Sequence, residues 1–100
     1  MANEKEPERF ELKEGVAVSI GYGIKLTLVT CMYAHAKGGV NISTMRLRLV
    51  RDGREEDVTL ERVSPGERSF QAAAGVRLAI DYVDPYHQPS TAAVLLLPPA

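Results

Sequence analysis

The sequence has no tryptophan, only six aromatic residues (four tyrosines and two phenylalanines) and a single cysteine. One cysteine cannot form a disulfide within the chain, so the fold depends on its hydrophobic core, which fits a reducing compartment. The scarcity of aromatic side chains argues against the base-stacking platforms that bind single-stranded nucleic acid. Twelve basic and 13 acidic residues give a net charge of −1. We therefore expect no nucleic-acid partner.

Long hydrophobic runs are also missing. The longest, Ala92–Leu97, is far too short to cross a bilayer, so we expect no membrane insertion. The N-terminus, MANEKEPERF, is charged where a signal peptide carries an apolar segment, which predicts a cytoplasmic protein. If a start methionine has replaced a natural leader here, the expectation changes to export. Residues 1–8 are charged and contain Pro7, which predicts a flexible tail before a single domain over residues 9–100.

What the sequence does have is an alternation of apolar and polar residues with a period of two. From Ile24 to Met32 the even-numbered residues form an apolar face, so we expect Cys31 to face away from Leu28. Residues 34–41 are predicted to connect two strands around a glycine pair. Seven or eight short strands separated by turn signals predict an all-β, mostly antiparallel β-sandwich with little or no helix, or alternatively a squat β-barrel.

The clearest local signal is Asp52-Gly53, a dipeptide preferred in two-residue hairpin turns because both positions need a positive φ. A two-residue loop predicts that Arg51 stands opposite Arg54 and Arg48 opposite Asp57. Basic and acidic residues then mix across the hairpin, which favours a solvated surface over a nucleic-acid site.

The stretch CMYAHAKGG raises the question of a metal site, because it holds Cys31 and His35. On a strand, residues four apart are separated by roughly 13 Å, too far to share one metal ion unless the chain bends between them. The favoured interpretation is a half-buried strand cysteine followed by a surface histidine. The alternative is a copper site formed by Cys31, His35 and His87, with Met32 as a thioether ligand, because these ligand types suit that ion.

Catalytic motifs are missing as well. There is no Gly-x-Ser-x-Gly, and no recognisable cysteine-protease signature surrounds Cys31. The carboxylates of residues 55–57 lie next to the predicted turn, where a solvated edge explains them. We expect no enzyme activity and no cofactor; an enzyme of unknown type is the weakest of the alternatives.

Three regions are candidate partner-binding surfaces. The C-terminal strand carries apolar side chains on both faces, and at a sheet edge it would invite pairing with another chain; a central position, covered on both faces, is the alternative. The proline-flanked loop after Asp84 contains Tyr86 and His87, and the hairpin carries Arg46 and Arg48. The C-terminal residues concerned are Val94, Leu95, Leu96 and Leu97. The sequence thus favours a non-catalytic interaction module that binds a protein partner or itself as a homodimer, with copper binding as the alternative.

Three segments have the patterns F-x-L-x-x-G, G-x-x-L-T-x-V and G-V-R-L-x-I-x-Y-V-x-P-Y. In these patterns the chain resembles small bacterial β-sandwich proteins, which are often exported or lipid-anchored. The resemblance implies the sandwich fold and no particular activity. The residues that carry it are Phe10, Leu12, Gly15, Gly23, Leu26, Thr27, Val29, Gly75, Leu78, Ile80, Val83, Pro85 and Tyr86.

Overall fold

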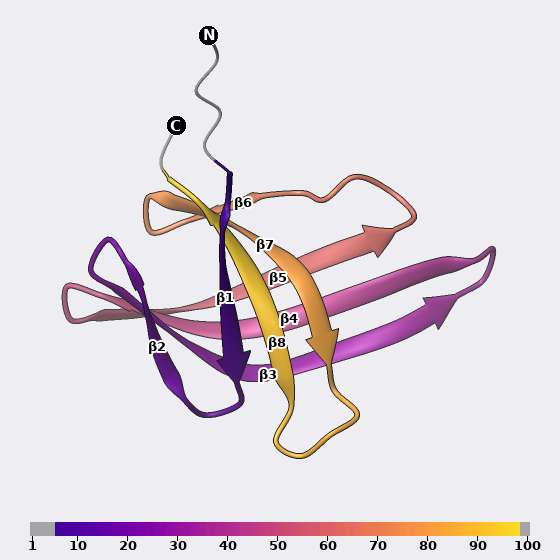
Figure 1. The fold of residues 1–100 in the computed structure, drawn as a ribbon, viewed down its shortest axis with the longest axis horizontal. Coiled ribbons are helices and arrows are strands. Elements are labelled where there is room, and N and C mark those ends of the chain that lie inside the picture. Colours follow the sequence, from indigo (N-terminus) through magenta and orange to yellow (C-terminus); the bar gives the residue numbers. More distant parts are fainter. Residues whose placement is uncertain (1–5, 99–100) are drawn as a thin grey trace, which may run out of the picture.

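The alternating pattern forms eight β-strands in the computed structural model, which describes residues 6–98 (Figure 1). No helix occurs within these residues, so the all-β prediction is confirmed. The strands are β1 (Glu8–Lys13), β2 (Ala17–Gly21), β3 (Ile24–Ala36), β4 (Val40–Arg51), β5 (Arg54–Ser64), β6 (Gln71–Ala73), β7 (Val76–Asp84) and β8 (Thr91–Leu97).

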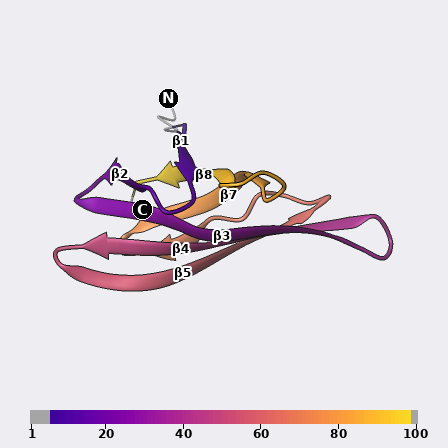
Figure 2. The same ribbon diagram turned by 90° about the horizontal axis from the view of Figure 1, so that it is seen from below.

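The strands form two four-stranded sheets whose strand pairs are all antiparallel. The first sheet has the order β1-β8-β7-β6 and the second the order β2-β3-β4-β5. Figure 2 shows them as two stacked layers. Neither sheet closes on itself, so the sandwich is confirmed and the barrel alternative is wrong.

The core lies between the two sheets and is almost entirely aliphatic. Its large side chains are less than about one-fiftieth exposed, which is the burial that drives folding of a disulfide-free domain. The second sheet contributes Ile24, Leu26, Leu28, Met45, Leu47, Leu49 and Leu60, and the first contributes Leu12, Val76, Leu78, Ile80 and Leu96.

The predicted β4–β5 hairpin is confirmed. Arg51 stands opposite Arg54 and Arg48 opposite Asp57, and the turn residues Asp52 and Gly53 have φ values of 53° and 75°. Among the described ion pairs, however, none joins Arg48 to Asp57 within 4.0 Å. The register therefore follows from the turn and the apolar face rather than from that charge pair.

The predicted facing of Cys31 is wrong because β3 contains a bulge. The register shifts between Leu28 and Thr30, so the extra residue reverses the alternation. Cys31 consequently joins Leu28 on the inner face and is only 5% exposed, whereas Met32 points outward and is 62% exposed. β3 then continues to Ala36, so the connection is limited to residues 37–39 rather than the predicted 34–41.

Of the two positions considered for the C-terminal strand, an exposed edge and a covered central place, the structure shows the central one. β8 lies between β1 and β7, and its alternate faces are both covered. Val94 and Leu96 pack in the core, while Leu95, on the outer face, is 7% exposed. The domain itself starts with Glu8 in β1, one residue earlier than predicted, and residues 1–5 of the predicted tail lie outside the described part of the chain.

Candidate functional site

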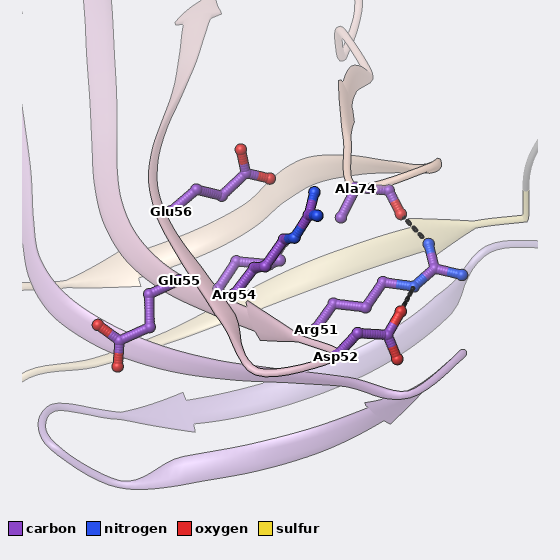
Figure 3. A pocket seen from close by; sticks show the side chains of 7 residues that line it. Arg51, Asp52, Arg54, Glu55, Glu56 and Ala74 are labelled. Atoms are coloured by element: carbon purple, nitrogen blue, oxygen red, sulfur yellow. Dashed lines mark hydrogen bonds and ion pairs between the residues drawn. The ribbon is translucent and has the colours of Figure 1, made fainter.

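A hollow lies where the β4–β5 hairpin meets the β6–β7 turn (Figure 3). Its volume is about 620 Å³. Arg51 donates a hydrogen bond from Nη1 to the main-chain oxygen of Ala74, and its Nε lies 4.0 Å from Asp52 Oδ2. These contacts tie the hairpin of the second sheet to a turn of the first. The lining residues are Leu49, Arg51, Asp52, Arg54, Glu55, Glu56 and Ala74.

The chemistry of this hollow is limited. Its lining contains no serine, cysteine or histidine, so it offers no hydroxyl or thiol nucleophile paired with an imidazole base. Glu55 and Glu56 are neighbours on a strand and point in different directions (Figure 3), so they do not face one substrate together. Two guanidinium groups and three carboxylates nearly cancel in charge, and no strong field attracts an ion of either sign.

Cys31 is a core residue rather than part of a site. Its Sγ lies 3.7 Å from the main-chain oxygen of Thr91, which it faces across the two sheets. Burial raises the pKa of the Cys31 thiol above its usual value. A buried neutral thiol is a poor nucleophile and a poor metal ligand.

The two histidines each have a different partner. His35 Nδ1 is hydrogen-bonded to Asn41 Oδ1 across the β3–β4 hairpin, and its ring meets Tyr33 edge-on with 5.0 Å between centroids. His87 Nδ1 lies 2.9 Å from Asp84 Oδ2 in the β7–β8 loop. Because β3 runs without a break to Ala36, nothing folds His35 back toward Cys31. Residues 6–98 contain no group of three His, Cys, Asp or Glu side chains able to hold a metal ion.

Of the residues predicted to bind a partner, some are buried in the structure and others are exposed. Val94, Leu95 and Leu96 are inaccessible within β8. Tyr86 is 72% exposed in the β7–β8 loop, and Arg46 and Arg48 are exposed on the outer face of β4. Leu97, at the end of β8, is half-buried.

A cluster of charged side chains around Asp81 covers part of the outer face of the first sheet. Arg9 Nε lies 2.7 Å from Asp81 Oδ2, and Arg68 Nη2 lies 3.2 Å from Oδ1. The Arg9 guanidinium also stacks over Tyr82, 5.4 Å from the ring centroid. Since Arg9 stands opposite Leu95 in the register, its aliphatic stem explains why that leucine is buried.

The second sheet extends beyond the first at one end. In Figures 1 and 2 the far ends of β3, β4 and β5 project past β7 and β8. We call this part, residues 32–44 with 61–64, the wing. The register places Met32, Ala34, Ile42 and Val63 together on its outer face; Met32 is 62% and Val63 45% exposed. We call these four residues the apolar patch.

Sequence reasoning missed the apolar patch. The signal was present in the alternation of β4 and β5, which puts Ile42 and Val63 on one face. The contribution of β3 could not be predicted, because uninterrupted alternation, without the bulge, assigns Met32 to the core.

One edge of the wing has no neighbouring strand. β2 pairs with β3 only as far as Thr27, and an isolated bridge from Glu14 reaches Leu28. Beyond that point, residues 30–36 pair with β4 on one side and, within the described chain, with no strand on the other, and Val29 is the unpaired residue of the bulge. We call residues 29–36 the open edge.

No family model, curated protein or solved structure matches this chain. The resemblance to small bacterial β-sandwich proteins therefore stays a prediction. No helix in the described part of the chain is long and apolar enough to span a membrane.

Proposed function

We propose that this chain is a non-catalytic protein-binding module and that its binding surface is the wing. The observation that carries the proposal is the apolar patch, in which Ala34, Ile42 and Val63 form one row across β3, β4 and β5, and Met32 lies two residues from Ala34 on the same face. Single exposed apolar side chains are ordinary, but a contiguous group on a projecting element is typical of interaction sites.

The chemistry of the patch supports binding to another protein. A thioether side chain adapts to partners of different shape, and the three strands beneath it provide a rigid platform. Among the strand residues on this face of the wing, only Glu61 is charged, and it lies in one row with Thr44 and Met32. Desolvating the patch therefore costs little, and its burial contributes roughly 25 cal/mol per Å² of apolar surface.

The lining of the hollow at the β4–β5 hairpin is consistent with the same proposal. That hollow is lined by arginine, acidic and aliphatic residues, and the buried Cys31 is not among them. The scattered positions of Cys31, His35 and His87 give no support to the copper alternative.

The test is photo-cross-linking in cells that produce the chain. A photoreactive amino acid at position 32 or 63 is expected to give discrete covalent adducts with another polypeptide. The same group at Ser19, an exposed position on the outer face of β2 in the same sheet, is the matched control and is expected to give none. If neither wing position gives an adduct, or if Ser19 gives the same adducts, the proposal is wrong.

A further inference from the structure

We propose that the open edge pairs with the open edge of a second copy of this chain, so that the two second sheets join into one continuous sheet. The inference rests on the proposed function, because it uses the wing, and it adds the identity of the partner and the way it binds. The pairing is antiparallel, with main-chain hydrogen bonds between β3 of one copy and β3 of the other.

The open edge differs from the other edges of the fold in having no protection. Unpaired strand edges are usually guarded by charge, proline, short length or a covering side chain. Residues 29–36 read VTCMYAHA, with no lysine, arginine, aspartate, glutamate or proline. The bulge between Leu28 and Thr30 lies at the beginning of this segment, so the remaining residues stay regular.

The remaining edges are all guarded. β6 has three residues and β2 has five, with a register irregularity between Ser19 and Gly21, and β1 and β5 alternate with charged side chains. β7 lacks a strand neighbour beyond Leu78 on its β6 side, but arginines occupy that position. Arg68 Nε donates to the main-chain oxygen of Ile80 at 3.1 Å, and Arg62 Nη1 donates to that of Asp81 at 3.2 Å. The contrast singles out the open edge as the one available for strand addition.

A second copy fits this edge better than an unrelated strand does. Two-fold pairing brings identical residues close together, so an edge that carried fixed charge would repel itself. The open edge carries none. Antiparallel pairing about an axis normal to the sheet also keeps each face continuous, so Met32 and Ala34 of both copies join one apolar surface.

The alternation of side chains between the two faces limits which residues of the two copies can stand opposite each other. Residues that face each other in an antiparallel pair lie on the same side of the sheet, so the two-fold axis passes through a residue rather than between two residues. In the middle of the open edge that residue is Met32, Tyr33 or Ala34. His35 then never stands opposite its own copy, and protonation of the imidazole creates no direct like-charge pair.

The shape of the molecule leaves room for this pairing. The wing lies beyond the first sheet in both views (Figures 1 and 2), so a second wing can approach it without the two first sheets meeting. The molecule measures 40 × 39 × 18 Å, and its thin dimension runs through the two layers.

The first measurement is the mass in solution by sedimentation over a dilution series. Wild-type chain is expected at twice the mass of one chain, dissociating on dilution. Ala34→Lys places a charge on the open edge and is expected to weaken the dimer at least about tenfold. Thr59→Lys, an exposed position on the opposite edge strand β5, is the matched control and is expected to leave it unchanged. Circular dichroism checks that both variants fold.

The second measurement is a cysteine scan at positions 32, 33 and 34 in a Cys31→Ala background. One position, the one on the two-fold axis, is expected to form an intermolecular disulfide much faster than the other two. A wild-type monomer at every concentration, a dimer unaffected by Ala34→Lys, or equal oxidation at all three positions overturns the inference. A monomer whose position 32 still cross-links to a different protein overturns the second copy and leaves the proposed function standing, whereas a monomer with no adduct overturns both.

Discussion

Cys31 and Met32 are neighbours in the sequence and lie in opposite environments: Cys31 is 5% exposed and Met32 62%. The thiol faces Thr91 of the other sheet, and the thioether lies on the outer face of the wing. The bulge just before them decides which one enters the core. The same backbone irregularity therefore removes the only cysteine from solvent and creates the apolar patch.

The Cys31 thiol is expected to resist alkylation in the folded chain. It is buried, and the raised pKa lowers its thiolate fraction at pH 8 below that of an unfolded cysteine. Iodoacetamide labelling followed by mass spectrometry should be slow without denaturant and fast in urea. Fast labelling of the folded chain would show that β3 does not have this bulge.

The same raised pKa makes stability depend on pH at the alkaline end. Below the ordinary value of 9.0 the thiol is protonated in both states. As pH rises above it, the unfolded chain releases the proton while the folded chain still holds it, so ionisation favours unfolding. The free energy of unfolding is expected to fall through this window. Cys31→Ala, which removes the titrating group, should show a smaller fall in urea titrations over the same pH range.

The sequence predicts the fold where local chemistry decides it. Asp52-Gly53 requires left-handed backbone angles, and the alternation on either side then leaves one register, with Arg48 opposite Asp57. The sandwich follows in the same way, because eight short alternating strands on a 100-residue chain bury their apolar faces against each other.

What sequence reasoning could not predict depends on contacts between distant parts of the chain. β8 is central because β1 returns from the other end of the chain to pair with it. The apolar residues on both faces of β8 allow a central position, but they do not show which strands flank it. The bulge adds one residue to an ordinary-looking run, Leu28-Val29-Thr30, and the candidate site depends on that residue. The apolar patch therefore exists only in the folded structure, where β3, β4 and β5 lie next to one another.

Leu96 is expected to contribute to stability and not to partner binding. Its side chain is 2% exposed in the core, and Leu96→Ala leaves a cavity that should lower the free energy of unfolding by about 2–5 kcal/mol. Urea unfolding followed by circular dichroism measures the loss. The folded fraction should associate as wild type does; a change in association with unchanged stability would contradict the central position of β8.

Gly53 is expected to matter through its backbone angle alone. Its φ is 75°, and a methyl group added there would meet no atom within 4 Å. Gly53→Ala should therefore lower stability by about 1–2 kcal/mol, the cost of the left-handed conformation. Gly53→Asn is the matched control, because asparagine tolerates this region better and should lose less. Equal losses in both variants would point to a steric cause instead.

Arg68 is expected to stabilise the unpaired part of β7. Its Nε donates to the main-chain oxygen of Ile80 at 3.1 Å, and its Nη2 lies 3.2 Å from Asp81 Oδ1. Arg68→Gln removes the fixed guanidinium geometry and should lower stability by about 0.5–1.5 kcal/mol, while exposing a carbonyl edge to other chains. Arg46→Gln, an exposed position with no described hydrogen bond, is the matched control and should stay within about 0.5 kcal/mol of wild type. Chemical denaturation measures the stabilities, and light scattering during refolding measures the association of exposed edges. If the two variants behave alike in both measurements, the arginine does not guard β7, and the contrast between the open edge and the other edges loses one of its supports.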